Sequence, residues 1–382
     1  MGIYKCKLGE VITQRREKSD GSPLPICGVS KDGLIPPKQI DADTSIYNTF
    51  YYKDFIFNPA RMELNSIAFN DKYEKAICSS LYEVFFVHRT DLILPEYLKL
   101  IVKQKWFTRY CEFLGQGSVR EYCRFANISE IEIDIPPMEI QEKAVYCDKV
   151  IAERINIKKQ INNNLEATAQ ALFEENFTAY YGKNELPDGW SISTLDNLCT
   201  VKGGKRLPAD SELIDTPTNH PYIRVRDVGE NRYVCLTNQF QYIDEDTYSA
   251  ISRYIVNTDD IVISIVGTIG LIGKIHSSLN GANLTENCVK LSNIHTVTSD
   301  YIYYTLGYKK RIKEIELLTV GAVQAKLPMY NIQSMSILVP PQDKLENFQS
   351  KLNAFNVQIE ANTIEIQKLY ELQDNLLTMM SD

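Results

Sequence analysis

Two stretches of the chain carry the same pattern, and together they decide how the molecule is organised. Residues 117–143 read GSVREYCRFANISEIEIDIPPMEIQEK, and residues 321–347 read GAVQAKLPMYNIQSMSILVPPQDKLEN. The offset between them is 204 residues, and it aligns identical residues such as Asn127 and Asn331. Self-similarity at a fixed offset indicates an internal duplication.

The match continues on both sides of these stretches. Downstream, the offset of 204 residues persists as far as Leu172 and Leu376. Upstream there are three shorter matches, namely Pro95-Glu-Tyr-Leu with Ser299-Asp-Tyr-Ile, Asp54-Phe-Ile-Phe with Asp260-Ile-Val-Ile, and Leu8-Gly-Glu-Val with Leu195-Asp-Asn-Leu. The chain is therefore predicted to contain two copies of one unit, each a variable body followed by a more similar tail.

Both tails are predicted to be long helices. Each follows a Pro-Pro pair, which suits the entry into a helix, and no glycine or proline falls between Pro137 and Gly182 or after Pro341. In the second tail, spacings of 3 and 4 alternate as in the heptads of a coiled coil. The predicted seam consists of Ile151, Ile155, Leu165 and Leu172 in the first tail, and Leu352, Phe355, Ile359, Ile366, Leu369 and Leu376 in the second.

Two such helices in one chain most simply pair with each other. The alternative is two amphipathic helices that pack on separate cores. Lys158 and Asn362 interrupt the seam at corresponding positions. Buried polar residues in a seam can fix the register of a coiled coil, and we expect this role here.

The bodies are predicted to be mixed α/β (α+β) domains in two tandem copies. Strand-like runs lie at 222–225, 261–266, 288–291 and 336–339, and residues 300–318 have a helical pattern. The predicted domains are a first body at 1–137, a first helix at 138–182, a second body at 183–341 and a second helix at 342–382.

Composition and charge bound the class of protein. The 382 residues are 44% hydrophobic and 24% charged, which is typical of a soluble globular chain of two or three domains. The net charge is −8, but the acidic excess lies mainly in residues 138–185 and 342–382. Because the bodies are near neutral, total charge says little about partners.

The longest apolar run, 261–275, is too short for a membrane span, and the N-terminus has no apolar signal core. We therefore expect a cytoplasmic protein without membrane contact.

No catalytic or metal-binding constellation emerges from the sequence. The nine cysteines include no C-x-x-C pair, so they are expected to be reduced thiols. The stretch from Gly267 to Lys274 has five residues between Gly and Gly-Lys and then Ile275, whereas a P-loop needs four and then Ser or Thr. Neither Pro-Pro pair has the flanking Asn and Tyr of an amino-methyltransferase loop. By elimination, a binding or assembly protein without catalytic residues is expected.

Several basic or polar stretches suit nucleic acid. Cations near phosphates supply affinity, and guanidinium groups can make bidentate contacts to guanine. The alternatives are solvated loops, pairing of the arginines with Asp227, and simple turn caps. The candidate DNA-binding residues are Lys202, Lys205 and Arg206 on a flexible Gly-Gly backbone, Arg224 and Arg226 on one strand face, Arg15, Arg16 and Lys18 at the corresponding place in the first copy, and Ser118, Arg120 and Gln324 at the tips of corresponding loops.

The order and duplication of these motifs resemble the DNA specificity subunit of type I restriction–modification systems. The similar motifs are Leu186-Pro-Asp-Gly-Trp190, Gly203-Gly-Lys, Tyr222-Ile-Arg-Val-Arg-Asp227, Asp260 to Thr268, and Leu369 to Leu377. The resemblance covers the whole chain and adds Thr268 to the DNA-binding candidates. In the first body, Ile56-Phe-Asn-Pro-Ala-Arg61 replaces the Gly-Thr turn, which adds Arg61.

The resemblance implies a function for each part. The bodies would be target recognition domains, each reading half of a bipartite target in double-stranded DNA. The helices would pair antiparallel and set the nonspecific gap, and the approximate twofold symmetry would hold two methyltransferase subunits, which restriction subunits could join. S-adenosylmethionine, ATP and magnesium would belong to those partners, with no cofactor in this chain. Two rivals stay open, a coiled-coil scaffold that does not bind DNA and a free-standing enzyme with an unrecognised site.

Overall fold

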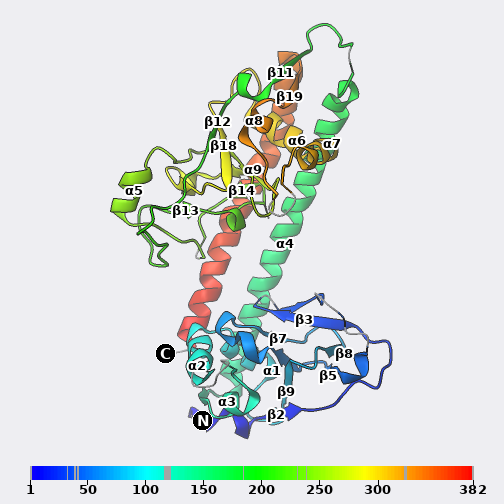
Figure 1. The fold of residues 1–382 in the computed structure, drawn as a ribbon. Coiled ribbons are helices and arrows are strands. Elements are labelled where there is room, and N and C mark those ends of the chain that lie inside the picture. Colours follow the sequence, from blue (N-terminus) through cyan, green and yellow to red (C-terminus); the bar gives the residue numbers. More distant parts are fainter. Residues whose placement is uncertain are drawn as a thin grey trace. The chain divides into compact units, whose positions relative to one another are not determined.

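The computed structural model describes residues 2–31, 33–37, 40, 43–115, 122–183, 185–229, 231–237, 239–321 and 325–380. The chain divides into two compact units. The first unit comprises residues 1–154 and 369–382, and the second comprises residues 155–368. Each unit therefore contains one body and parts of both long helices (Figure 1).

A pair of short strands closes each body at its two chain ends. In the second body β11 (Ser191–Thr194) runs antiparallel to β19 (Ser336–Val339), and in the first body β1 (Tyr4–Lys7) runs antiparallel to β10 (Glu132–Ile135). A 3-10 helix follows the first strand of each pair, at Leu195–Asn197 and at Leu8–Glu10. The duplicated Leu-x-x-aliphatic motifs thus occupy equivalent places.

The central sheets of the two bodies have the same strand order. The first sheet is entirely antiparallel, and the second gains one extra strand that is parallel to its neighbour. In order, the strands of the first sheet are β2 (Ile12–Arg15), β9 (Glu83–Val87), β6 (Phe55–Phe57) and β7 (Ile67–Phe69). Those of the second are β12 (Thr200–Gly203), β18 (Cys288–Ser292), β15 (Ile261–Ser264), β16 (Ile272–Ile275) and β14 (Tyr233–Val234).

The central strands β6 and β15 are buried on both faces, which explains their continuous apolar sequences. The residue before each strand motif, Lys53 or Asp259, has a positive φ of 66°. The aspartate that follows, Asp54 or Asp260, accepts a hydrogen bond from the backbone N–H three residues before it, at 2.7 and 2.9 Å. The Asp-apolar-apolar-apolar motif is therefore a turn followed by a buried strand in both copies.

Three helices follow the sheet in each body. They are α1 (Pro95–Val102), α2 (Lys105–Gly115) and α3 (Phe125–Ser129) in the first, and α6 (Ser299–Gly307), α7 (Lys309–Leu317) and α8 (Met329–Gln333) in the second. The helical pattern predicted over 300–318 is thus two helices, because Tyr308 has an extended backbone between them.

The remaining elements differ between the bodies, in the regions that the sequence repeat does not match. The first body adds a sheet of β4 (Gly33–Ile35), β3 (Ile26–Ser30), β8 (Lys75–Cys78) and β5 (Asn48–Tyr51), in that order. The second adds a parallel pair, β13 (Tyr222–Ile223) with β17 (Asn283–Leu284), and helix α5 (Glu245–Ile251).

The two predicted long helices are α4 (Met138–Phe177) and α9 (Gln342–Met379). α4 ends five residues before the predicted limit of 182, where a short 3-10 helix begins at Thr178. Within the second unit the helices run antiparallel, since Lys158 lies 2.8 Å from Glu365, whereas Phe177 stacks edge-on against Phe348 with ring centroids 5.1 Å apart. The predicted antiparallel pair is confirmed, and the alternative of separate cores is wrong.

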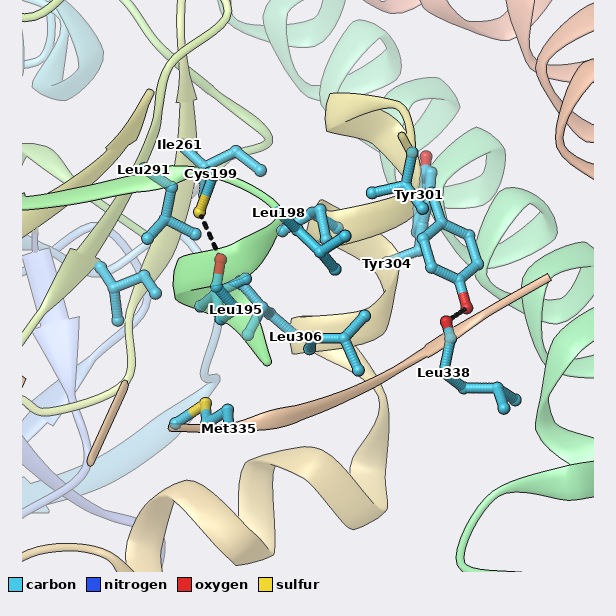
Figure 2. Close-up of a cluster of buried hydrophobic side chains, with 14 of the residues drawn as sticks. Leu195, Leu198, Cys199, Ile261, Leu291, Tyr301, Tyr304, Leu306, Met335 and Leu338 are labelled. Carbon is cyan, nitrogen blue, oxygen red and sulfur yellow. Dashed lines mark hydrogen bonds between the residues drawn. The ribbon is translucent and has the colours of Figure 1, made fainter. Parts of the chain in front are cut away.

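The paired helices also contribute to the core of the second body. Phe173 and Phe177 from α4 and Phe348 and Leu352 from α9 belong to one buried cluster with residues of the central sheet and α6. Figure 2 shows part of this cluster, in which the Tyr301 hydroxyl donates to the carbonyl of Leu338. Body and helices in this unit are therefore packed together without a linker between them.

Candidate nucleic-acid interface

The strand register places several candidate segments at one edge of the second body's central sheet. β12 and β15 both run antiparallel to β18, and their last residues, Gly203 and Ser264, lie opposite Val289 and Cys288. The segments that follow β12 and β15 therefore emerge together, where β18 begins. We call this the loop edge of the second body; Lys205, Arg206 and Thr268 follow it directly in the chain.

A third segment approaches the same edge. The backbone N–H of Leu327 donates to the carbonyl of Ile265 at 2.9 Å, and Val266 forms an isolated bridge with Lys326. The chain around the predicted loop 321–324 thus lies beside the turn that carries Thr268. Gln324 itself lies outside the described residues, and Thr268 is exposed.

The first body repeats this arrangement. β2 and β6 end opposite the start of β9, with Arg15 paired to Val84 and Phe57 paired to Glu83. The turn after β6 is a 3-10 helix at Pro59–Leu64, which carries the exposed Arg61 in the place of the Gly-Thr turn.

The loop after α2 in the first body is tied to the same turn. The N–H of Cys123 donates to the carbonyl of Pro59 at 3.0 Å, which brings the chain next to the predicted loop 117–120 to this edge. Ser118 and Arg120 lie outside the described residues. In both bodies, the described residues that follow the predicted loop therefore lie beside the turn after the central strand.

Arg15 has a partner within its own body. Its guanidinium makes a bidentate contact with Asp54, at 2.6 and 3.1 Å, and lies over the rings of Tyr51 and Phe86. Burial raises the pKa of Asp54, and the charge of Arg15 partly offsets that effect. A bidentate pair of this kind holds β2 against the turn before β6, so its direct contact with DNA stays a prediction.

Arg16 and Lys18 are the exposed cations of this segment. Arg16 donates to the side chain of Gln14 at 2.8 Å, and Lys18 donates to Asn48 at 2.7 Å and to the carbonyl of Ile46 at 3.1 Å. These partners are neutral, so both side chains keep their full charge available for a phosphate.

The prediction that Arg224 and Arg226 share one strand face is wrong. β13 ends at Ile223, and Val225–Asp227 form a turn of 3-10 helix. The cause is Asp227, which accepts from the backbone N–H of Arg224 at 2.8 Å and stops the extended chain. Burial raises the pKa of Asp227 to about 6, against the opposing effect of Arg226.

The proposed alternative for these arginines, pairing with Asp227, is observed. The Nε atoms of Arg224 and Arg226 lie 3.5 and 3.6 Å from its carboxylate. Arg224 also donates to Gln241. Arg226 is the more exposed of the two, because its side chain keeps 58% of its accessible surface against 19% for Arg224.

Three exposed cations lie on β12 or directly after it. Lys202 lies on β12 itself and is exposed. Lys205 donates its backbone N–H to the carbonyl of Leu284 at 2.8 Å, and Arg206 forms an ion pair with Glu286 at 2.7 Å. The side chain of Arg206 remains 81% exposed, and an ion pair at such a site contributes little stability. A phosphate could therefore replace Glu286 as its partner at small cost.

The expectation of a flexible backbone at Gly203-Gly204 is wrong for Gly204, which is closely packed. A Cβ atom on Gly204 would lie 2.1 Å from the carbonyl oxygen of Thr285 and 2.3 Å from that of Leu284. Gly204 is thus required by the close approach of two backbone segments. The approach holds Lys205 and Arg206 beside Glu286.

Gly204→Ala is expected to displace this segment and to destabilise the second body by about 3 kcal/mol, because two backbone carbonyls would have to move. Gly203→Ala is the matched control, since a Cβ there meets nothing within 4 Å. Thermal unfolding of the two variants measures the difference. Equal transition temperatures would contradict the constraint on Gly204.

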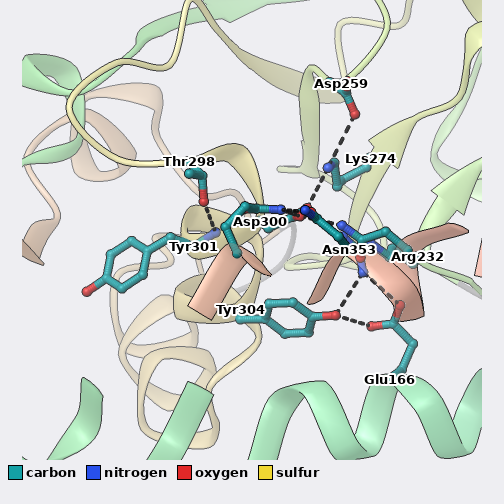
Figure 3. A network of polar contacts seen from close by, with 11 residues as sticks. Glu166, Arg232, Asp259, Lys274, Thr298, Asp300, Tyr301, Tyr304 and Asn353 are labelled. Carbon is teal, nitrogen blue, oxygen red and sulfur yellow. Dashed lines mark hydrogen bonds and ion pairs between the residues drawn. The ribbon is translucent and has the colours of Figure 1, made fainter. Parts of the chain in front are cut away.

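The sequence did not reveal a buried ionic network in the second unit, shown in Figure 3. Asp300 on α6 accepts from Arg232 at 2.5 Å and from Lys274 at 2.6 Å. The Arg232 side chain is fully buried and also lies 3.4 Å from Glu166 of α4. The one sequence signal was Lys274 on β16, whose neighbours in the sequence are apolar, which is typical of a buried position.

Polar residues also join the two long helices. Asn362 donates to Asn162 at 2.8 Å and accepts from Lys158 at 3.0 Å, all within the second unit. Lys158 and Asn362 are equivalent residues of the repeat, so they contact each other as expected for duplicated helices in antiparallel pairing. Within the first unit, Gln373 donates to Asp148 at 2.6 Å.

The predicted seam residues vary in burial. Ile151, Ile155, Leu352 and Ile359 are buried. The others are partly buried, namely Leu165, Leu172, Phe355, Ile366, Leu369 and Leu376.

The predicted solvated face over 309–313 holds with one exception. Lys309, Lys310 and Lys313 are exposed, whereas Arg311 is buried and donates to Glu314 and to the carbonyl of Ser336.

Among the residues that the structure describes, no group of three metal-ligating side chains was found. A search of the same residues found no helix long and apolar enough to cross a membrane.

The repeated fold defines a class: a tandem duplication of an α/β body with long paired helices. Residues 23–167 and 187–371 match the family described as the type I restriction modification DNA specificity domain. These two matches cover most of the chain, so the chain belongs to this family.

Individual relatives agree with this assignment. The type I restriction enzyme MjaIX specificity subunit of Methanocaldococcus jannaschii is 24% identical over 305 residues, covering 75% of this chain and 68% of that protein. The HindI specificity subunit of Haemophilus influenzae is 20% identical over 357 residues, covering 75% and 76%. A crystal structure of the type I S subunit from M. genitalium has the same fold, with a TM-score of 0.52, 15% identity and coverage of 100% and 96%.

Proposed function

We propose that this chain binds double-stranded DNA and directs a type I restriction–modification enzyme to a bipartite target. Each body reads one half-site through its loop edge. The paired helices keep the half-sites at a fixed separation. The chain itself carries no catalytic residues in this proposal and supplies only recognition and assembly.

The observation that carries the proposal is the repetition of the loop edge. In each body the same two strands end opposite the start of the same third strand, and polar or basic residues follow both of them. The variable elements of the bodies differ, whereas this edge is built twice in the same way. Two equivalent edges suit two half-sites, because half-site spacing in DNA recognition is a matter of geometry.

The exposed cations of the second body suit contacts to both the phosphate backbone and the bases of DNA. Lys202, Lys205 and Arg206 are exposed and suit the phosphate backbone. Arg226 suits a base edge in the major groove, since a guanidinium binds guanine in bidentate fashion. The exposed Thr268, on the turn after β15, is a further candidate for contact with a base.

Partners follow from the family. We propose that two methyltransferase subunits bind the duplicated helices and that restriction subunits join them in the cytoplasm. S-adenosylmethionine, ATP and magnesium then belong to those subunits. In this proposal the target recognition domains are residues 1–137 and 183–341, and the helical spacers are residues 138–182 and 342–382.

The test is co-expression of this chain with its methyltransferase subunit in a methylation-free host, followed by mapping of modified adenines. A split motif with a constant gap is the expected result. The double variant Lys205→Gln/Arg206→Gln should weaken duplex binding by the purified complex, and the slope of log K against log salt should fall by up to about two.

Lys309→Gln/Lys310→Gln is the matched control, because these exposed lysines lie at the start of α7 and belong to none of the three segments at the loop edge. It should leave the salt slope unchanged. A stable complex that neither modifies nor binds duplex DNA would contradict the proposal and favour the scaffold alternative. Turnover by the isolated chain would instead favour the enzyme alternative.

A further inference from the structure

The ionic network of the second unit has two layers. The inner layer lies within the body and consists of Arg232, Lys274 and Asp300. The outer layer comes from the helices, because Glu166 of α4 contacts Arg232, whereas Gln349 and Asn356 of α9 donate to the second oxygen of Asp300, at 2.8 and 2.7 Å.

Each of these groups is held in a defined direction. Asp300 accepts four hydrogen bonds, two on each carboxylate oxygen. The Tyr304 hydroxyl bridges Arg232 at 2.9 Å and Glu166 at 3.2 Å (Figure 3). Hydrogen bonds weaken steeply when they are bent, so a rotation of the body on the helices would break several of them in a buried site.

Three residues of this network have apolar counterparts in the first unit. The repeat aligns Gln349 with Val145 and Asn356 with Ala152. Phe69 takes the position of Lys274 in the strand register, and both Phe69 and Val145 pack against the apolar core of the first body. The first body contacts α4 through a different polar residue, because Gln141 donates to the carbonyl of Leu92 at 2.8 Å and accepts from the N–H of Leu94 at 2.9 Å.

We propose that Glu166, Gln349 and Asn356 are positioning residues that hold the second body at one orientation on α4 and α9 and thereby restrict the enzyme to one gap length. This inference rests on the proposed function above. A gap changed by one base pair rotates a half-site by about 35° about the duplex axis, which follows from about 10 base pairs per turn. A body held by these hydrogen bonds resists that rotation more than a body that has lost them.

The test is the triple variant Glu166→Ala/Gln349→Ala/Asn356→Ala, mapped for modified adenines in complex with the methyltransferase. Neither inner cation is left without a carboxylate, because Arg232 and Lys274 keep Asp300 and Lys274 also keeps Asp259 at 3.3 Å. We expect unchanged half-sites and about a tenfold rise in methylation at gaps one base pair too long or too short, relative to the correct gap, which corresponds to about 1.4 kcal/mol.

Two controls separate positioning from stability. Asn163→Ala/Glu175→Ala/Lys351→Ala places the same number of alanines at exposed sites on the same helices and should keep the wild-type ratio. Glu166→Gln, which retains an acceptor for Tyr304 and Arg232, should also keep it. A merely structural role would lower methylation equally at every gap.

An unchanged gap ratio in the triple variant would overturn the inference. If the triple variant modifies no site, the ratio is read from Glu166→Ala alone, and an equal loss at every gap there would overturn it as well. Failure of the proposed function is distinguishable, because it shows as the absence of any split motif in the wild-type complex.

Discussion

Removing one matched heptad from each long helix is expected to shorten the gap by about three base pairs and to leave both half-sites unchanged. Seven residues of helix span about 10.5 Å, and the duplex rises about 3.4 Å per base pair. The segments to remove are 158–164 and 359–365. The removed segments contain both partners of each polar contact, namely Lys158, Asn162, Asn362 and Glu365. The deletion therefore leaves none of these residues without its partner.

The measurement is again the map of modified adenines for the complex with the methyltransferase. Deleting 158–164 alone is the control, since it slips the register of the antiparallel pair and should abolish modification. A changed half-site with an unchanged gap would contradict a ruler function for the helices.

Asp300→Asn is expected to destabilise the second unit by about 3–5 kcal/mol. The substitution removes the carboxylate that faces Arg232 and Lys274, whose side chains are 0% and 4% exposed. Leaving buried charges without compensation is among the most costly single changes in a protein. Calorimetry on the full chain should show the transition of this unit lowered by about 10 °C.

The matched control for Asp300→Asn is Glu96→Gln at the equivalent position of the first body. Glu96 pairs with Lys53 at 2.7 Å, but both side chains are substantially exposed, at 30% and 43%. Such a pair contributes about 0–1 kcal/mol, so the control should unfold almost as the wild type does. Equal effects of the two variants would contradict the importance of burial in the network.

The ionisation of Asp300 gives this stabilisation a pH dependence. Burial alone would raise the pKa of Asp300, but the charges of Lys274 and Arg232 outweigh it and lower the pKa below its ordinary value. A lowered pKa in the folded state contributes stability above the unfolded value of about 3.9. That contribution is lost as the pH falls below about 4, so it is fully present at neutral pH.

Local sequence patterns were sufficient to predict the duplication, the two long helices and the pairing of the helices. These features depend on local patterns, since Pro-Pro entries, heptad spacing and the 204-residue offset can be read along the chain. The strands β15, β18 and β19 could also be predicted, because short apolar runs are local patterns. The polar interruption at Lys158 and Asn362 was also visible, because equivalent residues meet in an antiparallel duplicated pair.

The partners of the polar residues depend on tertiary contacts and could not be predicted from the sequence. Arg15 and Arg311 looked like surface cations, but each has partners that are distant in sequence, Asp54 for Arg15 and the carbonyl of Ser336 for Arg311. Gly204 looked flexible, yet it is fixed by the approach of residues 284–285 from another strand. Arg232, Lys274 and Asp300 meet from three separated segments, and burial there depends on packing between elements, which a local pattern does not record.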